Sequence, residues 1–196
     1  MNPASFSTNG MKIAIFSDNF YPEISGITDS LLTTGRELVK MGHEVAFICP
    51  RYANKDYEKA NLSREDENPE LAKFFFHHIP SLFFPGSATG QSRVAFPFGR
   101  SISFLKKFAP DIIYTNTPFG AGIEALIASK ILRVPLVGTN HTPIEEFMAY
   151  SPINGALAIR FAQKYYSWYY NRCQFITAPS GGLLEDMRKR GFKKQG

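Results

Sequence analysis

The sequence predicts an α/β fold, a Rossmann-like, doubly wound parallel sheet with helices on both faces. Three observations predict it. Short apolar runs recur along the chain, segments with helical periodicity follow most of them, and turn residues separate the two. Alternation of this kind gives parallel strands joined by right-handed crossovers. At 196 residues the chain has room for one sizeable domain and a real core.

The first strand–helix–strand unit lies in "MKIAIFSDNFYPEISGITDSLLTTGRELVKMGHEVAFIC", residues 11–49. Residues 12–17 are a short apolar run, typical of a buried strand. Residues 28–41 carry apolar side chains at helical spacing, and Gly42 ends the helix. Residues 44–49 are a second apolar run. We therefore expect two parallel strands joined by one helix.

The same pattern predicts strands at 73–79, 111–116, 135–140 and 174–180, and helices at 98–108, 120–134, 155–172 and 181–190. The helix over 155–172 carries Leu157, Phe161, Tyr165 and Trp168 in one register. The charged segment 51–72 is expected to be an exposed connection. Residues 79–99 are apolar, aromatic and rich in Gly and Pro. A connection that long is usually functional or disordered.

Composition indicates which partners and which cellular location to expect. A net charge of +5 favours acidic partners such as phosphates or an anionic membrane surface, but one basic run at the C-terminus indicates no nucleic-acid partner. Two cysteines form no disulfide framework, which indicates a reducing compartment. Residues 1–10 resemble a disordered leader, without a signal peptide, and no apolar stretch is long enough to span a bilayer. We expect a cytoplasmic protein, or a peripheral one on the inner face of the plasma membrane.

In open parallel sheets, ligands bind beyond the carboxyl ends of the strands. The loops 18–28, 115–120, 139–150 and 179–182 occupy that edge. The first loop has no dinucleotide-binding glycine pattern, but Gly26 stands at the start of the next helix. Free N–H groups there favour an anion. A purely structural reading, in which Gly26 permits a tight entry to the helix, is favoured when this residue is taken alone.

His141 follows a buried strand directly and lies among Thr139, Asn140 and Thr142. A histidine there can donate to a phosphate or a sugar hydroxyl, although a structural histidine is the common alternative. His77 and His78 are adjacent in a strand and point to opposite faces, so they cannot easily share a metal. No serine or cysteine nucleophile and no carboxylate pair is evident, and no metal site is predicted.

Three segments together resemble the opening of the group 1 (family 4) retaining glycosyltransferases. They are residues 11–50, the block "PDIIYTNTPFGAGIEALIASKILRVPLVGTNHT" and the block "ITAPSGGLLEDMRKRG". The resemblance implies a GT-B fold, in which residues 11–196 form the N-terminal, acceptor-side domain. It further implies a nucleotide sugar such as a UDP- or GDP-hexose as donor, no cofactor or metal ion, and a C-terminal donor domain that this chain does not include.

The resemblance also implies roles for residues in the four loops. His141 takes the catalytic position, where the family's histidine reaches the donor sugar and its phosphate. Near the donor phosphates we expect Ser25, Gly26, Ile27, Thr142 and Ser180. On the acceptor side we expect Asp18, Tyr21, Asn116, Thr117, Phe119, Glu145 and Tyr150. Two departures bear on the acceptor contacts: Ser25-Gly26 stands where two glycines are common, and Asn116 where a histidine is frequent.

The expected function is transfer of a hexose to an acceptor hydroxyl with retained configuration. The run "NHTPIEEFMAYSP" is most similar to the diacylglycerol and phosphatidylinositol glycosyltransferases, which favours a glycerolipid acceptor and leaves a soluble one open. A nucleotide-sugar 2-epimerase and a non-catalytic sugar- or lipid-binding module are the alternatives. A cluster of apolar residues between 79 and 99 either caps the core or forms an exposed membrane-binding patch. Its members are Leu82, Phe83, Phe84, Val94, Phe96 and Phe98.

Overall fold

The structure is a computed structural model and describes residues 10–84, 90–141, 144, 148 and 155–193. Its centre is a six-stranded, fully parallel sheet in the order β3-β2-β1-β6-β7-β8. The strands are β1 (Lys12–Phe16), β2 (Glu44–Pro50), β3 (Phe75–Ile79), β6 (Ile112–Thr115), β7 (Leu136–Thr139) and β8 (Phe175–Thr177). The predicted fold class and all six predicted strands are confirmed, with ends that agree or differ by up to three residues.

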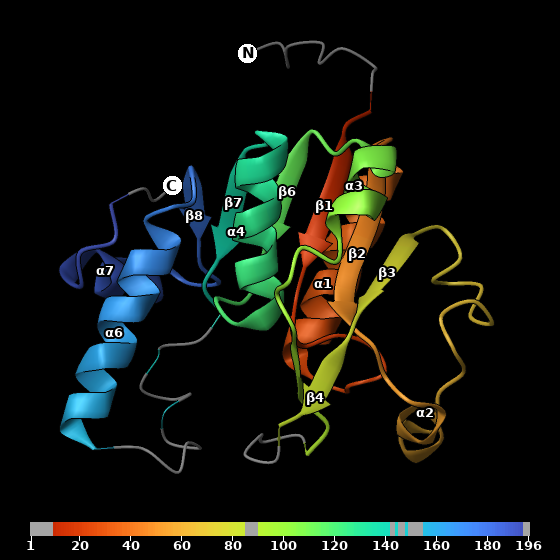
Figure 1. The fold of residues 1–196 in the computed structure, drawn as a ribbon, viewed down its shortest axis with the longest axis horizontal. Coiled ribbons are helices and arrows are strands. Elements are labelled where there is room, and N and C mark those ends of the chain that lie inside the picture. Colours follow the sequence, from red (N-terminus) through yellow and green to blue (C-terminus); the bar gives the residue numbers. More distant parts are fainter. Residues whose placement is uncertain (1–9, 85–89, 142–143, 145–147, 149–154, 194–196) are drawn as a thin grey trace.

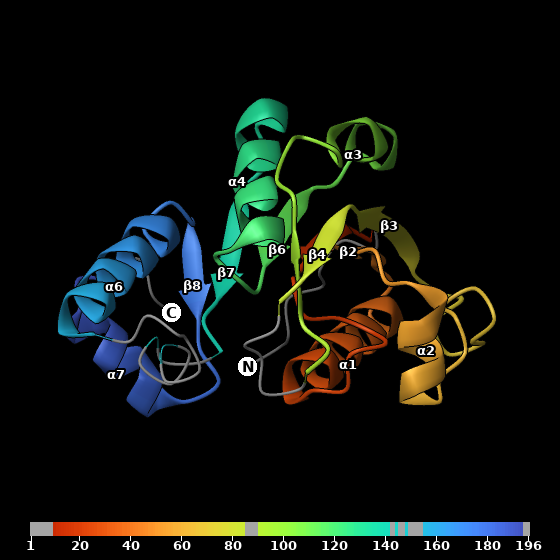
Figure 2. The same ribbon diagram turned by 60° about the horizontal axis from the view of Figure 1, so that its bottom comes forward.

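The described helices are α1 (Gly26–Lys40), α2 (Asn54–Ala60), α3 (Ile102–Phe108), α4 (Gly120–Leu132), α6 (Ala156–Tyr170) and α7 (Gly181–Lys189). Figure 2 shows α1 and α2 on one side of the central strands and α3 and α4 on the other. Side-chain alternation along β1 explains the two layers. Ile13 and Ile15 pack in the core beneath α1, whereas Ala14 and Phe16 pack in the core beneath α4.

Local sequence signals explain the ends of α1. Ser25 caps its N-terminus by accepting a hydrogen bond from the Thr28 N–H at 3.2 Å. Gly42 follows its C-terminus with φ of +89°, a backbone conformation that glycine adopts without strain. Midway along the helix, a Cβ on Gly35 would lie 2.8 Å from the Phe47 ring, so a small residue is required for α1 to pack this closely on β2.

Two regions differ from the prediction. Segment 51–72 is not simply exposed, because it contains α2 and buries Tyr57, Glu65 and Leu71 against the core. The irregular stretch 79–99 contains a second sheet, an antiparallel pair of β4 (Ser81–Phe83) and β5 (Arg93–Ala95). Figure 1 shows β4 extending beyond the carboxyl ends of the parallel strands.

The predicted leader falls on residues 1–10, of which 1–9 lie outside the described residues. Cys49 and Cys173 are both buried, and no disulfide joins them. Among the helices that the structure describes, none is both long and apolar enough to cross a bilayer.

Candidate active site at the carboxyl edge of the sheet

The strand order reverses direction between β1 and β6, so the loops after these strands diverge and leave room for a ligand. The predicted residues Asp18, Asn116 and Thr117 occupy these two loops, and His141 follows β7 next to them. The structure therefore brings the predicted catalytic histidine and three predicted acceptor-side residues to one edge.

His141 and Asn116 form a direct pair across the ends of β7 and β6. The Nε2 atom of His141 lies 2.8 Å from Asn116 Oδ1. Burial lowers the pKa of His141 below its ordinary value of 6.5. The imidazole is therefore neutral near pH 7, with its proton on Nε2, where it can donate to the amide oxygen. Its Nδ1 atom is then left as a hydrogen-bond acceptor.

The amide nitrogen of Asn116 completes this arrangement. Asn116 is 3% exposed, and its Nδ2 atom is buried without a hydrogen-bond partner. A buried, unsatisfied donor costs on the order of 1–3 kcal/mol, so a partner such as a water molecule or a bound ligand is expected for it. An oxygen atom of a bound ligand would satisfy it.

Asp18 and Thr117 are engaged within the protein. The Asp18 carboxylate accepts hydrogen bonds from Ala95 N at 3.0 Å, Ala121 N at 2.9 Å and Thr117 Oγ1 at 2.8 Å. Burial raises the pKa of Asp18, and these hydrogen bonds oppose that shift. Asp18 thus ties the hairpin strand β5 and the start of α4 to the end of β1. Its predicted contact with an acceptor stays a prediction.

The other predicted residues in the first loop differ in how deeply they are buried. Tyr21 is buried, and its hydroxyl donates to the Ser63 carbonyl at 2.5 Å. Ile27 packs against the core. A Cβ on Gly26 would meet no atom within 4 Å, and its φ is not positive, so packing does not explain this glycine. The open space at the first turn of α1 is consistent with close approach of a ligand.

Five further predicted positions lie at helix starts or outside the described residues. Ser180 caps α7, since its Oγ accepts from the Leu183 N–H at 3.3 Å. Phe119 precedes α4, and its ring lies 5.9 Å from that of Tyr166. The predicted residues Thr142, Glu145 and Tyr150 fall outside the described residues.

Two buried glutamates near the site were not predicted. Glu23 is 1% exposed and accepts hydrogen bonds from Asn19 Nδ2 and Ser92 Oγ, which holds the end of the hairpin loop against the first loop. Glu124 is fully buried and accepts from the backbone N–H groups of Gly99 and Ser101, both at 2.8 Å. Glu124 is the sole carboxylate in a largely apolar helix, and this position in the sequence was a signal that could have identified it.

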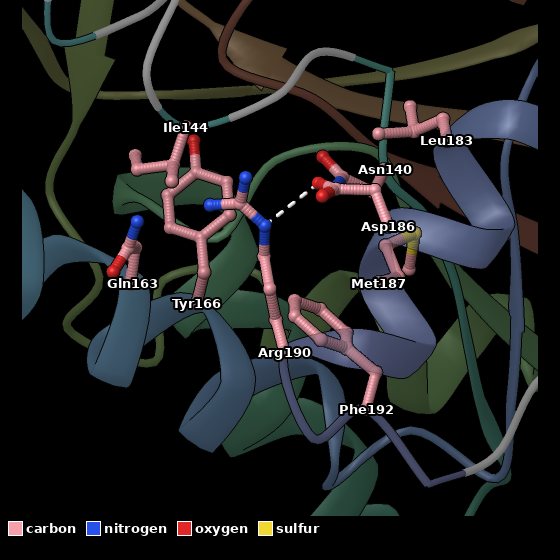
Figure 3. Close-up of a pocket in the computed structure, with 9 residues that line it drawn as sticks. All are labelled: Asn140, Ile144, Gln163, Tyr166, Leu183, Asp186, Met187, Arg190 and Phe192. Carbon is pink, nitrogen blue, oxygen red and sulfur yellow. Dashed lines mark ion pairs between the residues drawn. The ribbon is translucent and has the colours of Figure 1, made fainter.

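A small pocket lies beside the site, between α6, α7 and the end of β7 (Figure 3). Asn140, the neighbour of His141, lies at one side of it, and Tyr166 and Met187 supply apolar walls. Arg190 and Asp186 form an ion pair of 2.7 Å across it. Among the described residues, no cluster of three or more histidine, cysteine or acidic side chains could hold a metal ion.

Comparisons with known proteins identify the family of this chain. The Glycosyltransferase Family 4 model matches residues 24–195. An alpha-monoglucosyldiacylglycerol synthase of Streptococcus pneumoniae is 30% identical over 144 residues, covering 71% of this chain and 29% of the relative. A GDP-mannose-dependent alpha-mannosyltransferase of Corynebacterium glutamicum is 26% identical over 185 residues, covering 93% and 41%.

The chain thus spans less than half the length of these curated relatives. Among solved structures, UGT73P12 of Glycyrrhiza uralensis, solved with glycyrrhetinic acid 3-O-monoglucuronide, superposes with a TM-score of 0.55 at 13% identity. That match covers 95% of this chain and 48% of the other, and it supports the fold. Because the family model matches most of the residues described above, the chain belongs to glycosyltransferase family 4.

Proposed function

We propose that this chain forms the acceptor-side half of an enzyme that transfers a hexose from a nucleotide sugar to an acceptor hydroxyl with retained configuration. The observation that carries the proposal is the His141–Asn116 pair at the carboxyl edge of a family 4 domain. The bond between the anomeric carbon and the diphosphate breaks, a bond to the acceptor oxygen forms on the same face, and the acceptor proton leaves with the diphosphate.

Within this proposal, His141 contacts the donor sugar as a neutral imidazole. Its Nε2 atom is engaged with Asn116, so Nδ1 accepts a hydrogen bond from a sugar hydroxyl. The orphan Nδ2 atom of Asn116 donates to an oxygen of the acceptor or of the sugar. Both contacts position the reacting groups, which is a large part of what such transferases supply to catalysis.

The leaving diphosphate needs stabilisation, which we assign to backbone dipoles without a resident metal ion or other cofactor. Helix α1 begins at Gly26 and helix α7 at Gly181, and both glycines leave open space beside the first turn. Free N–H groups at such helix starts attract anions. In this scheme the remaining donor contacts come from the part of such enzymes that this chain does not span.

We propose a glycerolipid as acceptor. Two supports are independent of each other: some relatives are named alpha-monoglucosyldiacylglycerol synthases, and the hairpin beside the site exposes apolar side chains. Leu82, Phe83 and Phe98 are 62%, 53% and 71% exposed, so these residues do not cap the core. Apolar residues of this kind enter the boundary between headgroups and acyl chains. A cytoplasmic enzyme held on the inner face of the plasma membrane fits this arrangement.

Product analysis tests the proposal. An enzyme that carries this chain should transfer labelled hexose from UDP-glucose or GDP-mannose to diacylglycerol in vesicles. A nucleotide-sugar 2-epimerase would instead convert a UDP-sugar into its C2 epimer without any acceptor. Formation of that epimer, with no acceptor glycosylated, would overturn the proposed reaction.

A further inference from the structure

Helix α6 buries only one of its two sides. Its inner side places Tyr166, Tyr169 and Tyr170 in the core. The residues predicted to share one face with Tyr165 lie on the outer side, where Leu157 and Phe161 are each 71% exposed and Trp168 is 44% exposed. Positions separated by four and seven residues lie on one stripe of a helix. The prediction of a common register is confirmed, but the stripe faces outward.

Basic side chains accompany this apolar stripe. Arg160 and Lys164 are exposed, and their spacing places them within or beside the stripe. Arg172 lies with its guanidinium 3.8 Å from the centre of the Trp168 ring and donates to the Trp168 carbonyl. Between Glu146 and Glu185 the sequence contains no acidic residue. The stripe therefore combines large apolar groups with positive charge alone.

This combination indicates which partner fits. A surface helix with Trp, Phe and Leu on one side and Lys and Arg beside them is suited to the interface of an anionic bilayer. Helix α6 begins at the end of the molecule toward which β4 also extends (Figure 1), so Leu157 and Phe161, in its first turns, lie nearer to that end than Trp168, in its last turn.

We infer that α6 is a second membrane-contacting surface, one that binds anionic lipid headgroups through Arg160, Lys164 and Arg172 while Leu157, Phe161 and Trp168 enter the interface. It deepens the proposed function by adding a second anchor, separate from the hairpin. The biological role of this contact rests on the proposed lipid acceptor. The binding of α6 to anionic lipid does not, because it depends only on the residues of this helix.

Trp168 is the only tryptophan in the chain, so its fluorescence reports directly on this surface. The 196-residue chain is titrated with vesicles of phosphatidylglycerol and phosphatidylcholine. We expect a blue shift of the emission, and quenching by brominated lipids, that weaken at high salt and disappear with phosphatidylcholine alone. The variant Arg160→Glu/Lys164→Glu should bind far more weakly, because each cation near an anionic surface contributes about fivefold.

Variants separate the possible outcomes. Phe161→Ser should reduce vesicle binding, whereas the control Ile131→Ser, at an exposed apolar residue of α4, should not. If the protein co-sediments with vesicles but Trp168 emission does not change, α6 is not a contact and the proposed hairpin anchor stands. If emission changes with protein concentration in the absence of lipid, a second copy of the chain covers the stripe and the inference is wrong. A protein that ignores vesicles altogether refutes both membrane contacts, and transfer to a soluble acceptor would remain the test of the proposed reaction.

Discussion

Asp18 should be a principal determinant of stability at the site, which Asp18→Ala tests. The substitution leaves three buried donors without an acceptor: Ala95 N, Ala121 N and Thr117 Oγ1. Each buried donor left unsatisfied costs on the order of 1–3 kcal/mol, and Thr117 can turn its hydroxyl elsewhere, so we expect a loss of about 4 kcal/mol. For a chain of this size that corresponds to a melting temperature roughly 8–16 °C lower.

The assay is thermal unfolding followed by circular dichroism, with amide hydrogen exchange at Ala95 and Ala121 as the local measurement. Asp18→Asn, which keeps one acceptor oxygen, should lose about half as much stability. The control is Asp66→Ala, because the Asp66 side chain is 78% exposed and its ion pair with Arg64 is 3.6 Å long. An Asp18→Ala variant that melts within about 3 °C of the wild type would refute the reasoning from unsatisfied donors.

Three further predictions follow from the same geometry. Gly26→Ala should fold with nearly unchanged stability, because its Cβ meets no atom, yet it should weaken donor binding; unchanged donor affinity would return Gly26 to a purely structural role. Titration of His141 followed by NMR should give a midpoint below 6.5. Because the unfolded chain then binds more protons than the folded one, the free energy of unfolding should fall as the pH drops through 6.5 towards the lowered pKa of His141. A midpoint above 6.5 would contradict the buried, neutral imidazole. Phe83→Ser/Phe84→Ser should weaken binding to anionic vesicles, because the hairpin anchor is lost and only the α6 contact remains, without lowering the melting temperature; a large fall in melting temperature would instead place these side chains in the core.

The fold was predictable because its signals are local. Apolar runs, helical spacing and stop residues such as Gly42 identify the six strands and most of the helices. The placement of His141 and Asn116 at one edge follows from the same reading, since carboxyl ends of parallel strands meet at one side of a sheet. That His141 bonds directly to Asn116 was not predicted, because the pair depends on the register between β6 and β7.

The missed features depend on tertiary contacts. The hairpin β4–β5 has strands of three residues each, too short for a periodic signal, and Asp18 and Glu23 hold it from far away in the sequence. Helix α2 lies in a charged segment, and two of the buried residues of this segment pair with each other: the Tyr57 hydroxyl donates to the Glu65 carboxylate at 2.7 Å. Charge along a sequence indicates exposure only when no partner is near.

Helix α6 shows a different limit. Its periodicity identifies which residues share a face, but periodicity cannot say which face meets the core. The tyrosines lie on the side of α6 that packs on the core, because their hydroxyls can bond to buried carbonyl groups. Tyr169 OH donates to the Gly122 carbonyl at 2.8 Å, and Tyr170 OH donates to the Thr139 carbonyl at 3.1 Å.

The central claim is that His141 serves the transfer reaction, and the kinetics of His141→Ala test it most directly. The assay measures hexose transfer to diacylglycerol vesicles by an enzyme that carries this chain as its acceptor-side half, with the anomeric configuration of the product read by NMR. We expect an α-linked product from an α-linked donor, and a loss of two to three decades in kcat, or about 3–4 kcal/mol, with an unchanged circular dichroism spectrum. The control His43→Ala removes a histidine whose Nδ1 only accepts a hydrogen bond from the Met11 N–H, so it should keep near-normal kcat. Near-normal kcat in His141→Ala, or a product of inverted configuration, would contradict the account.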